Sequence, residues 1–201
     1  TVDGPRTDAI PEDVTTYTYH PSTDAQQYGF MATGTNALGH LTTYQGYDSM
    51  GRPGTIADPN GVQSTFSYDE MGRVATTTVV GAAPSENILT SYTYDDHVGH
   101  LQTVTNPRTF VTTYTEDPAH RLTDVMDPLG NVMHTDYDLM SRRIREELRD
   151  NVGAVHQFTN FANDAFGRLA HVCFTGAVVD CPGTAVHTNL TYDGNGNLLR
   201  E

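Results

Sequence analysis

The sequence predicts an all-β protein in which tandem antiparallel β-hairpin repeats form a long, twisted, spiralling sheet. Three observations support this: a Tyr-Asp-x-x-Gly-Arg phrase recurs, an Asp-Pro-x-Gly phrase falls between its copies, and strand-like residues separate the two. The repeats are expected to fill residues 15–201 as about seven degenerate units, after an irregular lead-in of residues 1–14.

The Tyr-Asp phrase is clearest in two copies, residues 47–52 and 68–73. Degraded copies start at Tyr94, Tyr114, Tyr137, Asn163 and Tyr192, and the one at Tyr114 is interpreted as a stretched copy that ends in His120-Arg121-Leu122. The starts are spaced about 24 residues apart on average, which is a length typical of a supersecondary repeat.

Both phrases have the chemistry of tight turns. In Asp58-Pro59-Asn60-Gly61 and in residues 127–130, the Asp side chain can accept a bond from the backbone two residues on, and Pro presets φ. Residues 106–109 and 36–39 are weaker copies of the same phrase. In the Tyr-Asp phrase, Asp again starts the turn and Gly can adopt a positive φ.

The segments between the turns have strand character. Phe66 and Tyr68 share a face by their spacing of two, and residues 74–80 are mostly β-branched. Residues 140–151 could form a short charged helix, but a charged strand pair is the favoured interpretation. Each repeat is therefore expected to contain two antiparallel strands and two turns, with tyrosines stacked in a ladder from repeat to repeat.

The composition excludes several classes of function. The 201 residues carry a net charge of -14, which disfavours binding to a nucleic-acid backbone or an anionic membrane. All basic residues are Arg, so no lysine nucleophile or Schiff base exists. No apolar run is long enough for a membrane-spanning helix. The first residues, Thr1 to Pro5, indicate an excised piece or a processed product.

Two cysteines, Cys173 and Cys181, lie symmetrically about Gly176-Ala177. In a hairpin they would face each other closely enough for a disulfide, which would indicate an oxidising compartment. Two buried free thiols are the alternative interpretation.

The alternating phrases resemble the YD repeat of RHS proteins, and the resemblance covers nearly the whole chain. Such repeats occur in bacterial RHS polymorphic toxins, the C components of insecticidal toxin complexes, wall-associated proteins and teneurins. The resemblance implies a spiralling β-sheet that closes into a hollow shell around a toxin or C-terminal segment. A full shell needs more repeats than this chain has, so the chain resembles a segment of the wall.

No catalytic, cofactor or metal site is predicted, and the chain is expected not to be an enzyme. His97 and His100 form only a weak metal-ligand pair, and sheet packing could bring other histidines together in ways that the sequence does not show. Residues 193–197 resemble a calcium loop but lack its bidentate Glu and coincide with a repeat turn. Each repeated Arg is expected to pair with a neighbouring turn Asp or to cover a Tyr ring. The predicted turn and ladder residues are Tyr47, Asp48, Gly51, Arg52, Tyr68, Asp69, Gly72, Arg73, Tyr94, Asp95, Tyr137, Asp138, Gly167, Arg168, Tyr192 and Asp193.

These features favour a structural segment of a large secreted or cell-surface bacterial protein, part of a shell that encapsulates a toxin or C-terminal domain. One alternative is a surface adhesion module whose tyrosines bind carbohydrate. Another is a self-assembling fibre subunit, because open sheet edges recruit strands. The expected partners are adjacent repeats of the same or neighbouring chains, an encapsulated toxin domain or a surface glycan, with no nucleic acid and no membrane insertion.

Overall fold

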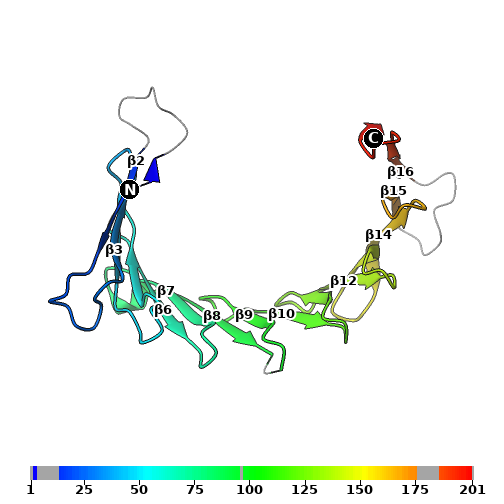
Figure 1. Cartoon of the computed structure of the whole chain (residues 1–201). Coiled ribbons are helices and arrows are strands. Elements are labelled where there is room, and N and C mark those ends of the chain that lie inside the picture. Colours follow the sequence, from blue (N-terminus) through cyan, green and yellow to red (C-terminus); the bar gives the residue numbers. More distant parts are fainter. Residues whose placement is uncertain (1, 4–13, 96, 176–185, 201) are drawn as a thin grey trace. The chain divides into compact units, whose positions relative to one another are not determined.

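The computed structural model describes residues 2–3, 14–95, 97–175 and 186–200 (Figure 1). The chain divides into two compact units. One comprises Thr1–Thr93 with Thr105–Arg108, and the other comprises Tyr94–Val104 with Thr109–Glu201.

The first unit is an antiparallel sheet in which each strand pairs with the next one along the chain. A single 3-10 turn, η1 (Pro84–Glu86), lies between β7 and β8. The strands are β1 (Val2–Asp3), β2 (Val14–Tyr19), β3 (Met31–Thr35), β4 (Leu41–Gln45), β5 (Thr55–Ala57), β6 (Gln63–Tyr68), β7 (Val74–Val79) and β8 (Ile88–Tyr94).

The second unit repeats this arrangement, with its longest strands at β13 to β15, and a separate two-stranded ribbon follows. Its strands are β9 (Leu101–Thr105), β10 (Val111–Glu116), β11 (Leu122–Met126), β12 (Val132–Tyr137), β13 (Arg143–Arg149), β14 (Val155–Asn163), β15 (Leu169–Thr175), β16 (Val186–Asn189), β17 (Thr191–Tyr192) and β18 (Leu198–Arg200).

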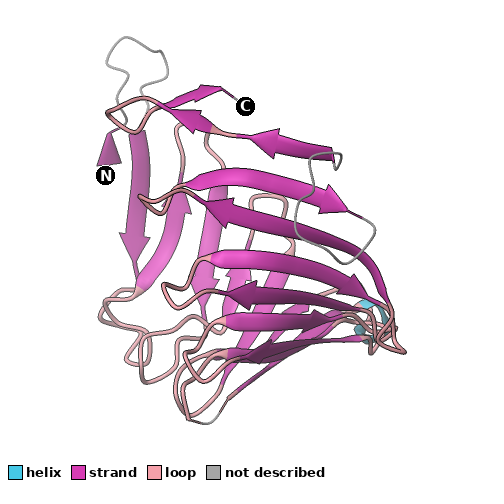
Figure 2. Ribbon diagram, turned by 90° about the vertical axis from the view of Figure 1, so that its right-hand side faces the viewer, coloured by secondary structure: helices cyan, strands magenta, loops and turns pink. Residues whose placement is uncertain are grey.

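The all-β prediction is confirmed, because η1 is the one helical element among the described residues. Figure 2 shows the strands as successive antiparallel neighbours joined by short turns. The charged stretch at residues 140–151 contains strand β13 rather than a helix. The expected lead-in of residues 1–14 contains β1, which pairs with β2, while residues 4–13 lie outside the described part. No described helix is long and apolar enough to cross a membrane.

Neither unit has a conventional hydrophobic core among its described residues. Only Phe158, Cys173 and Glu147 are buried there. Glu147 faces Phe158 across the β13–β14 pair and contacts the guanidinium groups of Arg145 and Arg149 at 2.5 and 2.7 Å. The other described side chains keep some contact with solvent, so stability must come mainly from contacts between neighbouring strands and turns.

The turns depend on one backbone feature. The fourth residue of the usual five-residue turn has a positive φ, and it is most often Gly, as at Gly72 (+87°) and Gly130 (+85°). Three turns place another residue there: Thr109 (+66°), His120 (+61°) and Ser141 (+61°). The left-handed region costs an L-residue roughly 1–2 kcal/mol, so these three turns carry backbone strain that the glycine turns avoid.

Ser141→Gly should therefore raise the free energy of unfolding by about 0.5 kcal/mol, because relief of the left-handed strain exceeds the added entropy of Gly in the unfolded chain. Urea unfolding measures this change. Leu139→Gly is the matched control in the same turn, at a residue without a positive φ, and it should lower stability. Equal losses in the two variants would contradict the strain argument.

Candidate functional site: the contact between successive repeats

The five-residue turns are organised by their first residue, an Asp or Asn. In the turn that starts at Asp69, Oδ1 accepts hydrogen bonds from the backbone N–H groups of Met71 (3.0 Å) and Arg73 (2.8 Å). The Asp69 N–H donates to the Arg73 carbonyl at 2.9 Å, and the Gly72 N–H donates to the Asp69 carbonyl at 3.0 Å. The same pattern occurs in turns of the second phrase, for example at Asp58. The two sequence phrases therefore encode one turn conformation.

In the Tyr-Asp turns, the second carboxylate oxygen holds the arginine that ends the turn. Asp69 Oδ2 accepts a hydrogen bond from Arg73 Nε at 2.7 Å. The same pair recurs as Asp48–Arg52, Asp117–Arg121, Asp138–Arg142 and Asp164–Arg168, all at 2.6 or 2.7 Å. The arginine therefore pairs with the Asp of its own turn and not, as expected from the sequence, with the Asp of a neighbouring turn, because Arg ends the same turn that Asp begins.

These contacts lower the pKa of the turn carboxylates. For Asp48 and Asp117, the hydrogen bond from the arginine side chain is the largest cause of the low pKa, and a backbone N–H from the same arginine adds to it. The pKa of Asp138 is lowered mainly by the backbone N–H of Arg142. A carboxylate held ionised in this way is unsuited to general acid catalysis.

Arg52, Arg121 and Arg168 each cover the tyrosine of the next repeat. The Arg52 guanidinium lies 4.4 Å from the Tyr68 ring centroid. The Tyr68 hydroxyl donates at 2.9 Å to the carbonyl of Pro53, the residue after that arginine. The pairs Arg121–Tyr137 and Arg168–Tyr192 repeat both contacts, with guanidinium distances of 4.8 and 4.5 Å and hydroxyl bonds of 2.8 Å.

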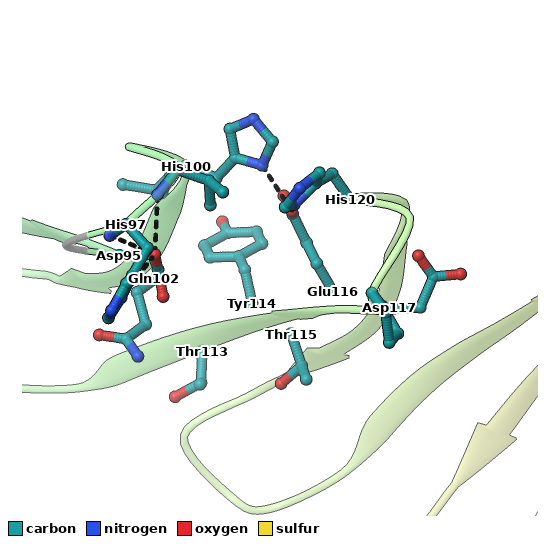
Figure 3. Close-up of a pocket in the computed structure, with 13 residues that line it drawn as sticks. Asp95, His97, His100, Gln102, Thr113, Tyr114, Thr115, Glu116, Asp117 and His120 are labelled. Carbon is teal, nitrogen blue, oxygen red and sulfur yellow. Dashed lines mark hydrogen bonds and ion pairs between the residues drawn. The ribbon is translucent and has the colours of Figure 1, made fainter.

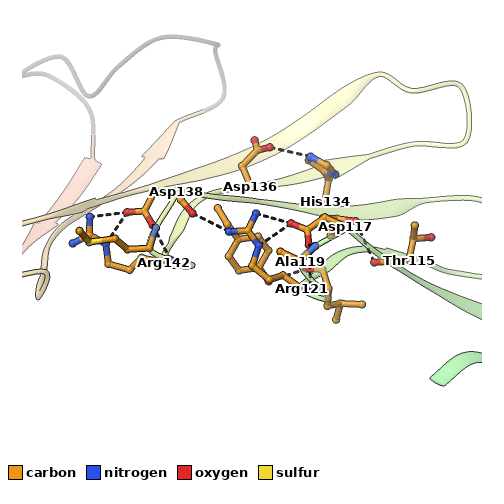
Figure 4. A network of polar contacts seen from close by, with 12 residues as sticks. Thr115, Asp117, Ala119, Arg121, His134, Asp136, Asp138 and Arg142 are labelled. Atoms are coloured by element: carbon orange, nitrogen blue, oxygen red, sulfur yellow. Dashed lines mark hydrogen bonds and ion pairs between the residues drawn. The ribbon is translucent and has the colours of Figure 1, made fainter. Parts of the chain in front are cut away.

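The glycine of the next turn completes the contact. A Cβ added at Gly72 would lie 2.4 Å from Arg52 Nη1, and one at Gly167 would lie 3.0 Å from Arg142 Nη1. Arg121 also donates from Nη1 to the carbonyl of Asp138 at 2.8 Å, which links two successive turns (Figure 4). Three positions therefore meet at a junction: the last residue of one turn, usually Arg, and two positions of the next repeat that usually hold Tyr and Gly.

The fourth copy of the phrase does not start at Tyr114, and it is not stretched. The register shifts directly before Tyr68, Tyr137 and Tyr192, and the same shift precedes Glu116. Asp117 pairs with Arg121 at the usual spacing of four. Glu116 therefore occupies the tyrosine position. Tyr114 suggested a start two residues too early, because residues two apart on a strand lie on the same face.

The sequence analysis also missed two turns. The Asp150 N–H donates to the Ala154 carbonyl at 2.9 Å, which makes an Asp turn without a proline. The His20 N–H donates to the Phe30 carbonyl at 2.9 Å and closes a longer loop. Phe30 takes the arginine position there and stacks on Tyr47 at 4.7 Å. The Asp-to-Gly spacing of three could have revealed the first, but the second starts at His20, where the turn phrases have an Asp.

One junction in the second unit is different. Here His100 ends the turn in the arginine position, since its carbonyl accepts the Asp95 N–H at 2.9 Å. His100 Nδ1 lies 2.5 Å from Glu116 Oε2, and His120 Nδ1 lies 4.0 Å from the same oxygen. Figure 3 shows these side chains at a pocket of about 510 Å³ that Tyr114 and His97 also line.

A second histidine lies between carboxylates on the sheet. His134 contacts Asp124 through Nδ1 at 2.7 Å and Asp136 through Nε2 at 3.2 Å. Asp124 and His134 are paired residues of β11 and β12, so the sheet register brings them together. No candidate nucleophile takes part in these contacts.

Two further sites considered from the sequence are a disulfide and a calcium-like loop. The expected Cys173–Cys181 disulfide involves residue 181, which lies outside the described residues, while Cys173 is buried in β15. Asp193 uses Oδ1 for the backbone N–H groups of Asn195 and Asn197 and Oδ2 for the Asn197 amide, so it forms a repeat turn.

Comparison with known proteins agrees with this architecture. Residues 55–85 match the RHS repeat family, which confirms the predicted resemblance to YD/RHS repeats. A structure of the Photorhabdus luminescens Tc holotoxin pore is similar over 92% of this chain, with 13% identity and a TM-score of 0.52. A crystal structure of TcdB2–TccC3 covers 92% of the chain at 13% identity with a TM-score of 0.41. This chain spans only 13% of either matched chain. No curated protein matches the sequence.

Gly72→Ala should destabilise the protein more than Gly61→Ala. Both glycines have a positive φ, so each change should cost about 1–2 kcal/mol. Only the Gly72 variant also displaces Arg52 from Tyr68, since nothing lies within 4 Å of a Cβ at Gly61. The extra loss should be about 0.5–1 kcal/mol, the usual strength of an exposed cation–π contact.

Urea unfolding of both variants measures the difference, and Arg52→Ala should abolish it. An equal cost at both glycines would show that the Arg–Tyr junction adds nothing to stability.

Proposed function

We propose that this chain is a wall segment of a large secreted or cell-surface protein whose repeats enclose a toxin or another C-terminal domain. The observation that carries this proposal is the junction itself. The Arg, Tyr and Asp side chains that recur along the chain are engaged in holding one repeat to the next, as at Arg121 and Tyr137. Repetition of this contact builds a sheet from successive repeats, and it leaves few of these side chains available to act on a substrate.

The comparisons support a role as part of something larger. The chain is a repeat segment similar in fold to a stretch of a Tc toxin chain that is several times longer. The lack of a conventional core in either unit fits this, because a repeat needs neighbours to cover its surfaces. Enclosure of a toxin comes from the family resemblance and is proposed here for the protein that contains this chain.

We propose that the chain has no catalytic activity of its own. The turn carboxylates are the most frequent candidate groups, and the hydrogen bonds of their own turns engage them. The tyrosine rings offer little for sugar stacking at the junctions, because arginine covers the rings of Tyr68, Tyr137 and Tyr192. The wall function is therefore favoured over the adhesion module.

Electron cryo-microscopy of the full-length protein that contains these repeats tests the wall proposal. The expected result is a hollow particle with this segment in its wall and density for a further domain inside it. The purified 201-residue chain is the control and should give no filaments. Filaments of the chain, or a full-length protein without an enclosed space, would favour the fibre subunit instead.

Secretion predicts that Cys173 and Cys181 form a disulfide in the native protein, since exported proteins encounter an oxidising environment. Peptide mapping of protein purified without reductant from its natural host should recover the two cysteines in one linked pair. A Cys173→Ser, Cys181→Ser double variant serves as the mass standard for the unlinked chain. Two free thiols in the exported protein would contradict the prediction.

A further inference from the structure

The junction at His100, Glu116 and His120 differs from its equivalents at all three of its positions. The other junctions described above keep at least two of the usual residues Arg, Tyr and Gly, and Arg52, Tyr68 and Gly72 form one with all three. Here His100 replaces the arginine, Glu116 the tyrosine and His120 the glycine. The repeat geometry brings these positions together regardless of sequence, and at this junction each of them carries a metal-ligating side chain.

The three side chains converge closely enough to share one ion. One ligating atom of each lies within 4.8 Å of those of the other two. The rings of His100 and His120 are 5.5 Å apart and almost perpendicular, and both histidines approach Glu116 Oε2 through Nδ1 (Figure 3). Two imidazoles and one carboxylate make a ligand set that suits zinc and related ions.

The backbone at His120 adds an independent argument. His120 has a φ of +61°, at the turn position that Gly fills in most other turns. A glycine would remove the strain and restore the usual residue of this turn position, so the turn itself gains nothing from the histidine. His120 lies only 4.0 Å from the Glu116 carboxylate, so the strained position aims a ligand at the cluster.

Only small side-chain movements are needed to admit an ion. Ligands on one tetrahedral zinc lie roughly 3.3 Å apart, given bonds of about 2 Å. The 2.5 Å contact between His100 and Glu116 must therefore open, while the 4.0 Å contact between His120 and Glu116 must close. Both imidazoles are about half exposed, so their rings can rotate, and water can supply the fourth ligand.

We propose that His100, Glu116 and His120 bind one zinc-class divalent metal ion that joins two successive repeats. The ion would take the place of the contacts that Arg, Tyr and Gly make at a junction such as Arg52, Tyr68 and Gly72. Metal binding requires an ionised carboxylate and imidazoles whose ligating nitrogens carry no proton. The site goes beyond the proposed wall function and does not depend on it.

Calorimetric titration of the chelator-treated 201-residue chain with Zn²⁺ tests the site. The wild-type protein should bind one ion specifically, and its Tm should rise with zinc concentration, because a ligand of the folded state stabilises that state. His97→Ala is the matched control, since His97 lines the same pocket but is almost fully exposed, and it should behave as the wild type does.

His120→Gly removes one ligand and restores the usual turn residue. It should bind zinc at least about tenfold more weakly. Loss of a residue that only supports a metal ligand already lowers metal affinity by about tenfold or more, and His120 is itself a ligand. Its Tm without metal should equal or exceed that of the wild type, which separates lost binding from lost folding. Glu116→Gln is the second variant and should also lose the zinc-dependent rise in Tm.

Three outcomes would overturn the proposal: no specific ion bound by the wild-type chain, unchanged affinity in His120→Gly, or an equal loss in His97→Ala. The last result would assign the binding to scattered surface histidines. None of these outcomes would affect the wall proposal, because that proposal concerns the other junctions and the full-length particle.

Discussion

The rest of the structure depends on one interaction, in which a single carboxylate oxygen of the turn aspartate accepts hydrogen bonds from two backbone N–H groups. At Asp138, Oδ1 accepts from Met140 and Arg142 and so fixes a five-residue turn through contacts within the turn itself. The turn sets the register of the flanking strands, and the second carboxylate oxygen orients Arg142. A purely local interaction thereby controls the side chain that makes contact with the next repeat.

This dependence explains how a chain with so few buried residues can form a defined structure. In most domains a hydrophobic core selects the arrangement of the elements. Here only three described residues are buried, and the selection occurs at each junction, where guanidinium, ring and carbonyl contacts recur with similar distances. The energy of each junction is modest, and the structure gains its specificity from repetition.

The fold could be predicted from the sequence because the residues that determine it act within single turns and strands. Asp, Gly and Pro mark the turns, and the spacing of two marks the strand faces, so the hairpin repeats could be predicted in order. The contacts at the junctions could be predicted only in part. Whether Arg52 would reach its own Asp or a neighbouring one depends on how successive turns stack, which no spacing along the chain reveals.

The metal site was missed for a related reason. Its signal is the replacement of three different repeat residues, and it becomes visible only when the repeats are aligned correctly. Tyr114 shifted that alignment by two residues and concealed the fact that Glu116 and His120 occupy the Tyr and Gly positions. The sequence analysis noted His97 with His100, whereas the structure brings His100 to Glu116 of the next repeat.

The pairing of each strand with its neighbour along the chain has a consequence for synthesis. A hairpin such as β11–β12 (Leu122–Met126 and Val132–Tyr137) is complete once a short stretch of chain has emerged. Its formation does not wait for distant segments, and closing such short loops costs little entropy. The protein can therefore fold from its N-terminal end while it is being translated, with each finished hairpin serving as the template edge for the one that follows.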